Sequence, residues 1–156
     1  MPRTTRKLCF ATLAVALTLS AADPFLGTWK LNMTKSSFSA GWPGPQRRTV
    51  VARQDGEWIV QDTDAVNATG QPVTSTNRFK FDGKEYEYRA TNGTAAKVTA
   101  KRTDDYHIDW VFTDSTGAVT KGRTIISRDG KTRTDTLQGT SPKGQPVNNT
   151  AVYDKQ

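Results

Sequence analysis

The sequence has little of what enzymes use for chemistry. Its 156 residues include one cysteine and one histidine. A single histidine excludes a metal site built from several histidines. None of the common nucleotide-binding, zinc-protease or serine-hydrolase spacings occurs either. We therefore predict a protein that is not an enzyme, with no catalytic residue, no metal site and no cofactor.

The single cysteine, Cys9, lies in a segment with the features of an export signal. Three basic residues precede the apolar stretch 8–19, and the small residues Ser20-Ala21-Ala22 follow it. This order is typical of a cleaved signal peptide. We predict that residues 1–22 are removed, that residues 23–156 form one domain, and that the protein is periplasmic or secreted. The apolar stretch is shorter than the roughly 20 residues that span a bilayer, so we predict no membrane span.

The sequence also lacks clustered positive charge. The formal net charge of the whole chain is +7. Residues 1–22 contain three basic and no acidic residues, which leaves +4 for residues 23–156. Basic residues there alternate with threonine and acidic residues, whereas nucleic-acid-binding proteins gather them on one face. We predict a monomer with no nucleic-acid partner. Without cysteines after residue 22, its stability must come from burial.

No window of helical length has apolar residues at a spacing of 3.6. Turn signals recur about every ten residues instead, and Asp-Gly and Asn-Gly pairs are typical of type I′ hairpin turns. These signals are Asp55-Gly56, Asp82-Gly83, Asn92-Gly93, Ser115-Thr116-Gly117, Asp129-Gly130 and Lys143-Gly144. They predict about ten strands, centred near Thr28, Val50, Val60, Arg78, Tyr86, Val98, Trp110, Thr124, Thr134 and Ala151.

Within the predicted strands, apolar and polar residues alternate, as in a sheet with one buried face. Tyr106, Ile108, Trp110 and Phe112 share one face, and Tyr86 shares a face with Tyr88 in an earlier strand. A flat sheet of this size would leave two unpaired edges, which closure removes. The predicted fold is all-β: an antiparallel up-and-down meander of 8–10 strands closed into a barrel.

The segment from Gly27 to Asn32, with Lys35-Ser36 and Phe38, and the ending from Pro146 to Gln156 resemble a group of small exported bacterial lipocalin-like proteins of uncharacterised function. The Gly-x-Trp in the first strand is similar to that of the calycin barrels, which comprise lipocalins and fatty-acid-binding proteins. This resemblance implies a barrel closed at one end by Trp29, with a cavity for a small apolar molecule.

The chain departs from fatty-acid-binding proteins in two places. Those proteins insert two helices after the first strand, but the Gly/Pro-rich segment 41–45 cannot form a helix. They also hold a ligand carboxylate with an Arg-x-Tyr pair in the last strand, whereas Ala151 stands two places before Tyr153. That role therefore does not transfer to this chain.

The candidate ligand-binding residues are the aromatic side chains of the inward faces, the tryptophan of the Gly/Pro-rich segment and one arginine. They are Trp42, Phe79, Phe81, Tyr86, Tyr88, Trp110, Phe112 and Arg123. Trp42 has two possible roles, a lid over a ligand or a packing plug, and loops serve structure more often than function. Arg123 points inward only if it shares the inner face with Val119 and Ile125. The opposite orientation, with Thr124 and Ile126 inside, is favoured because buried cations are rare.

The sequence supports two functions. The preferred one is an exported protein that holds a small apolar or amphipathic molecule inside the barrel without catalysis. The alternative is an exported interaction or inhibitor module that binds a protein or polysaccharide and has a filled barrel core. An interior cavity of about 300 Å³ or more would favour the first. His107, as a haem ligand or general base, is a weaker candidate. It lies on the other face of its predicted strand from Ile108 and Trp110, and that face points to solvent.

Overall fold

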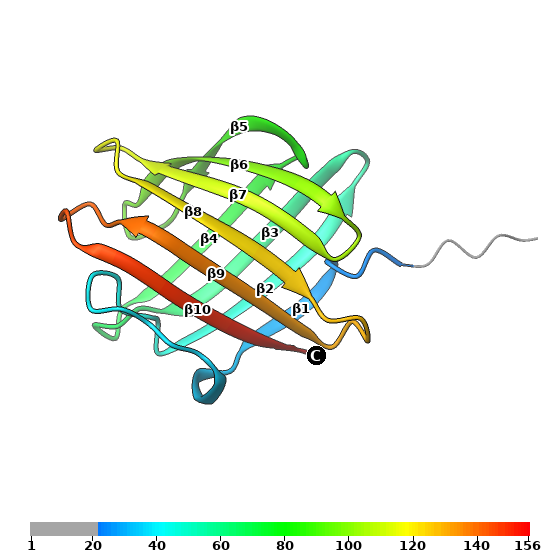
Figure 1. Cartoon of the computed structure of the whole chain (residues 1–156), viewed down its shortest axis with the longest axis horizontal. Coiled ribbons are helices and arrows are strands. Elements are labelled where there is room, and N and C mark those ends of the chain that lie inside the picture. Colours follow the sequence, from blue (N-terminus) through cyan, green and yellow to red (C-terminus); the bar gives the residue numbers. More distant parts are fainter. Residues whose placement is uncertain (1–21) are drawn as a thin grey trace, which may run out of the picture.

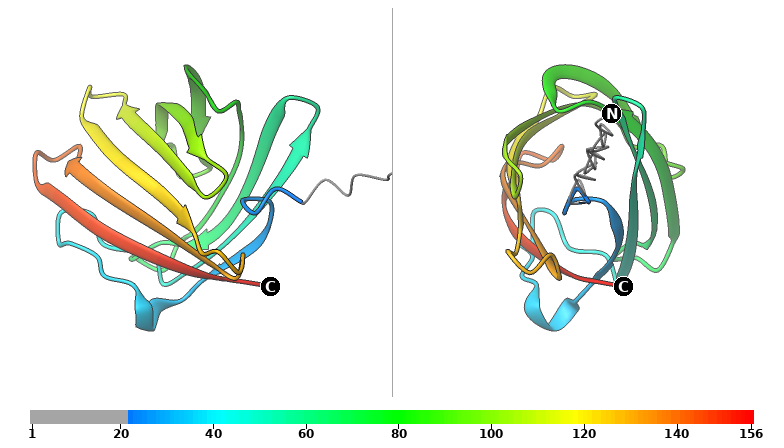
Figure 2. Two further views of the ribbon diagram at one scale, coloured as in Figure 1. Left: turned by 45° about the vertical axis from the view of Figure 1, so that its right-hand side comes forward. Right: turned by 90° about the vertical axis from the view of Figure 1, so that its right-hand side faces the viewer.

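Ten antiparallel strands follow one another along residues 22–156, the part of the chain that the computed structural model describes. They curve round a common interior, as Figures 1 and 2 show from three sides. The predicted signal peptide, residues 1–22, lies almost entirely outside the described residues. In chain order the strands are β1 (Gly27–Leu31), β2 (Arg47–Asp55), β3 (Trp58–Val66), β4 (Pro72–Phe79), β5 (Asp82–Arg89), β6 (Ala95–Asp104), β7 (His107–Asp114), β8 (Val119–Ile126), β9 (Thr132–Thr140) and β10 (Pro146–Lys155).

The predicted all-β meander is confirmed, and each predicted strand centre lies within a strand. The order in the sheet is β4-β3-β2-β1-β10-β9-β8-β7-β6-β5. The first strand therefore pairs with the last, in a register that places Trp29 opposite Lys155. The one helical element among the described residues is a single 3-10 turn, η1 (Met33–Lys35). The described residues therefore contain no helix that is long and apolar enough to cross a membrane.

The barrel has a seam between β4 and β5, which the turn pattern did not predict. The two strands are neighbours in sequence but stand at opposite ends of the sheet order. Single hydrogen bonds join this region in place of a ladder: the Thr91 N–H donates to the Thr74 carbonyl at 2.9 Å, and the Arg89 N–H to Asn77 Oδ1 at 3.4 Å. The barrel is therefore nearly closed.

Five of the six predicted turns occur, but not as type I′ turns. The sixth prediction, Asp82-Gly83, is wrong: these residues begin β5, which does not pair with β4. A type I′ turn needs positive φ at both central residues, and among the described residues only glycines have positive φ. In the β2–β3 hairpin, Asp55 pairs with Trp58 and Gly56 takes the positive φ of 59°, as the first position of a type II′ turn requires. The strand positions were predicted correctly because either turn type suits a hairpin.

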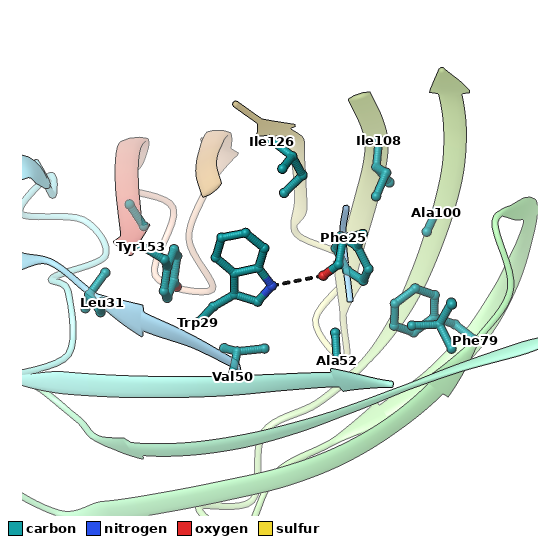
Figure 3. Close-up of a cluster of buried hydrophobic side chains, with 12 residues drawn as sticks. Phe25, Trp29, Leu31, Val50, Ala52, Phe79, Ala100, Ile108, Ile126 and Tyr153 are labelled. Atoms are coloured by element: carbon teal, nitrogen blue, oxygen red, sulfur yellow. Dashed lines mark hydrogen bonds between the residues drawn. The ribbon is translucent and has the colours of Figure 1, made fainter. Parts of the chain in front are cut away.

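One end of the barrel is closed by a cluster of buried apolar residues (Figure 3). Trp29 is completely buried, and its Nε1–H donates to the Phe25 carbonyl at 2.9 Å. Phe25 also packs edge-on against Phe81, with ring centroids 5.4 Å apart. Such burial of aromatic side chains contributes several kcal/mol, on the order of 25 cal/mol per Å² of apolar area. This end forms the floor of the interior.

Candidate functional site

The barrel encloses a cavity of about 340 Å³ above this floor. Pockets that hold small molecules occupy roughly 300–1,000 Å³ and are mostly apolar, with a few placed polar groups. The residues around this cavity come from the inner faces of β2 to β10 and from the segment before β2. Interior side chains therefore leave part of the barrel unfilled.

One wall of the cavity is aromatic. It contains five of the predicted binding residues: Phe79, Phe81, Tyr88, Trp110 and Phe112. Tyr88 packs edge-on against Phe112 with centroids 5.1 Å apart, and Phe79 packs in the same way against Phe81 at 5.6 Å. Phe81 lies in the connection between β4 and β5, whereas strand alternation places the other four here, as on β5, where Glu85 and Glu87 face solvent on either side of the inward positions. This wall suits the apolar part of a ligand.

Trp110 depends on the glycine opposite it. Gly122 in β8 pairs with Trp110 in β7. A Cβ at Gly122 would lie 2.4 Å from the Trp110 ring and 2.5 Å from the Thr136 carbonyl. The missing side chain therefore lets the indole lie against the sheet beside the cavity.

The Gly/Pro-rich segment lies over the end of the cavity opposite the floor. Trp42 lines the cavity with its ring centroid 6.1 Å from that of Phe112. Asn149 anchors the segment: its Nδ2 donates to the Trp42 carbonyl at 3.0 Å, and its Oδ1 accepts from the Ser39 N–H at 2.8 Å. Gly44 is in close contact with Phe38, because a Cβ there would lie 2.3 Å from the ring. Trp42 thus borders the space without filling it.

The structure places two predicted site residues away from the cavity. Arg123 is exposed on the outer face, where it forms a two-pronged ion pair with Asp109 at 2.6 and 3.0 Å. Strand β8 has the orientation with Thr124 and Ile126 inside. Tyr86 lies on the inward face of β5, as Tyr88 does. Its ring packs on Trp58 near the seam, with centroids 5.5 Å apart, and its hydroxyl donates to Asp82. Neither residue belongs to the cavity wall.

A second wall is polar. Ser75 and Asn77 of β4 are buried and line the cavity, with Asn77 Nδ2 donating to Ser75 Oγ at 3.0 Å. Gln61 and Thr63 of the adjacent strand β3 lie on the same side. These groups can exchange hydrogen bonds with a polar part of a ligand.

The charged residues on the cavity wall are Arg48, Arg133 and Asp135. Arg133 is buried and donates to Asp135 through Nε at 2.9 Å and through one terminal nitrogen at 2.8 Å. Arg48, from β2, reaches the Tyr153 hydroxyl at 3.4 Å. Tyr153 stands opposite Arg133 in the β9–β10 ladder and is buried. This cluster combines three strands.

Both arginines keep their charge inside the barrel. The Tyr153 phenol raises the pKa of Arg48 above its ordinary value, against the opposing effect of burial. Burial works against the charge of Arg133, but the ion pair with Asp135 outweighs it and raises the pKa of Arg133.

Sequence reasoning missed this cluster. Arg48 lies two positions before Val50 and four before Ala52, which are buried, so it is on the same inward face of β2. This alternation could have identified Arg48 from the sequence. Nothing in the sequence shows that Arg48 and Arg133, 85 positions apart, meet the same tyrosine.

His107 lies outside the cavity, as its parity predicted. It is half-buried near the β6–β7 turn, and its Nδ1 is 2.8 Å from both carboxylate oxygens of Asp104. Among residues 22–156, no three histidine, cysteine or acidic side chains lie together in a way that could hold a metal ion.

Neither a protein-family model nor a curated protein sequence matches the chain. Its fold is similar to that of solved barrels. The zebrafish ileal bile acid-binding protein, solved with cholic acid, is 18% identical over 85% of this chain and 99% of its own, with a TM-score of 0.53. Rv2717c from M. tuberculosis is 19% identical over 85% of this chain and 93% of its own, with a TM-score of 0.56. A luciferase domain from the dinoflagellate Lingulodinium polyedrum is 8% identical over 86% of this chain and 43% of its own, with a TM-score of 0.54. The fold is therefore a nearly closed, calycin-like antiparallel barrel with a cavity in its interior.

Proposed function

We propose that this protein binds a small apolar or amphipathic molecule inside its barrel and performs no chemistry on it. The observation that carries this proposal is the cavity of about 340 Å³ with one aromatic and one polar wall. The likeness to a bile acid-binding barrel supports the same class of ligand. The alternative, a binding module with a filled core, loses its structural premise because the core is not filled.

The proposal is tested by blocking the cavity. Thr63 lines it from β3, and Thr74 of the neighbouring strand β4 faces solvent. We expect the wild-type protein to bind the neutral dye N-phenyl-1-naphthylamine with a fluorescence increase that saturates at one dye per chain. Thr63→Phe should abolish this binding, and the matched control Thr74→Phe should retain it. A wild-type protein that takes up no dye, or two variants that bind equally, would contradict an internal site.

The natural ligand is sought by native mass spectrometry of the protein purified from its own host. A discrete small molecule retained by the wild type and lost from Thr63→Phe would identify the ligand.

We also propose that residues 1–22 direct export and that the domain acts in the periplasm or outside the cell. The basic, apolar and small-residue order of this segment supports the proposal. Expression of the full chain followed by cell fractionation and intact-mass measurement tests it. A cytosolic product that keeps residues 1–22 would overturn it.

A further inference from the structure

The interior of the barrel holds more positive than negative charge. Its charged wall residues are two arginines, Arg48 and Arg133, and one carboxylate, Asp135. Asp135 already accepts both Arg133 hydrogen bonds, and its Oδ1 also accepts from Thr124 Oγ1 at 2.7 Å. Asp135 therefore neutralises Arg133, and one unit of positive charge remains.

That remaining charge belongs to Arg48. The only hydrogen bond of its side chain among the described residues is the 3.4 Å contact with the Tyr153 hydroxyl, which is neutral in its protonated form. The Arg48 Nε is buried without a hydrogen-bond partner there, and so is one terminal nitrogen of Arg133, Nη1. Buried donors without acceptors are rare, because each loses its hydrogen bonds to water without replacement.

Tyr153 brings these donors together. Arg48 reaches its hydroxyl, and the guanidinium carbon of Arg133 lies 5.5 Å from its ring centroid. A guanidinium fork recognises the two or three oxygens of a carboxylate or sulfonate better than any neutral group. The cluster thus has unused donors, unbalanced charge and access to a cavity large enough for a small molecule.

We propose that the cavity selects a ligand with one anionic group, a carboxylate or a sulfonate, whose oxygens accept hydrogen bonds from Arg48 and from the free nitrogen of Arg133. This proposal rests on the proposed function and adds the charge of the ligand to it. The anionic group lies at Tyr153, and the apolar body lies along the aromatic wall. A ligand with one negative charge balances the interior, whereas a neutral ligand leaves Arg48 uncompensated.

The donors differ from those of fatty-acid-binding proteins. The last strand contributes the tyrosine but has Ala151 in place of the arginine of the Arg-x-Tyr pair. The two arginines come from β2 and β9 instead. The proposed anion site therefore draws its arginines from other positions than the Arg-x-Tyr pair.

Two dyes with the same aromatic skeleton test the proposal. The dye 8-anilinonaphthalene-1-sulfonate differs from N-phenyl-1-naphthylamine only by its sulfonate. For Arg48→Met we expect the affinity for the sulfonate dye to fall by about tenfold or more, which is the loss of one charge-assisted pair of hydrogen bonds. Affinity for the neutral dye should stay within about twofold of wild type. The matched control Arg47→Met removes the adjacent, exposed arginine and should change neither affinity.

Arg48→Lys provides a second variant. Lysine keeps the charge but not the fork, so this variant should retain part of the preference for the sulfonate dye. Dodecanoate should displace the sulfonate dye from the wild type far better than methyl dodecanoate does.

Three results would contradict these expectations. Failure of the wild type to bind either dye would overturn the proposed function and this inference with it. Binding of both dyes with no selective loss in Arg48→Met would overturn the anion site alone. Equal displacement by dodecanoate and its methyl ester would also overturn the anion site alone.

Discussion

Trp29 and Phe25 are joined by a hydrogen bond of 2.9 Å from the indole Nε1 to the backbone carbonyl, inside a floor from which water is excluded. The bond satisfies the one polar atom of the tryptophan side chain. It also holds the segment before β1 across the end of the barrel, where Phe25 meets Phe81. The floor thus depends on a contact between residues four positions apart.

Trp29→Phe should lower the free energy of unfolding by about 2–4 kcal/mol, through a cavity and the loss of this hydrogen bond. Urea unfolding followed by circular dichroism measures the change. Trp58→Phe is the matched control, because Trp58 is only half-buried beside Tyr86. Equal losses for the two variants would show that the floor does not dominate stability.

Gly122→Ala should displace Trp110 and lower stability by about 1–3 kcal/mol, since the new methyl group would meet both the indole and the Thr136 carbonyl. Affinity for N-phenyl-1-naphthylamine should fall, because Trp110 lines the cavity. Dye titration and thermal unfolding measure the two effects. Unchanged binding and stability would mean that the sheet adjusts at this position.

Asn149→Ala should loosen the segment that carries Trp42, because Asn149 bonds to both Trp42 and Ser39. If Trp42 is a lid, dye dissociation measured by stopped-flow should become several-fold faster. Asn148→Ala is the control, since Asn148 is exposed next to it. Equal dissociation rates in both variants would favour the role of Trp42 as a packing plug.

Arg123→Met should leave the affinity for both dyes unchanged. The Arg123 side chain lies on the outer face with Asp109, where water screens the ion pair. Thermal unfolding should show at most a small decrease. A selective loss of the sulfonate dye would place the anion site at Arg123 and not at Arg48.

Stability should fall as the pH drops below about 5. The backbone N–H groups of Lys84 and Tyr106 lower the pKa of Asp82 and Asp104 respectively, as the Ser127 hydroxyl does for Asp129. A carboxyl group with a lower pKa in the folded than in the unfolded state stabilises the protein above its unfolded pKa, and this contribution is lost as acid protonates it. Thermal unfolding from pH 7 to pH 2 measures the effect. The triple Asp→Asn variant should depend less on pH over this range, and an unchanged profile would contradict the assignment.

Local pattern was enough to predict much of this protein. Turn residues placed the strands, and alternation placed Tyr88, Trp110 and Phe112 inside and Glu85, Glu87 and His107 outside, because both depend on neighbours in the chain. The aromatic wall of the cavity could therefore be predicted. Alternation left both orientations of Arg123 open, and the rarity of buried cations favoured the outward one that the structure has.

Tertiary structure decided what depends on residues far apart in the sequence. Closure through β1 and β10 set the seam between β4 and β5, and it set how much space the interior side chains leave unfilled. Tyr86 lies on the same inward face of β5 as Tyr88, but it is beside the seam, where it packs against Trp58 and not against the cavity. Arg48, Arg133 and Tyr153 meet only because three strands curve round one interior, and alternation alone carries no information about which residues face each other across it.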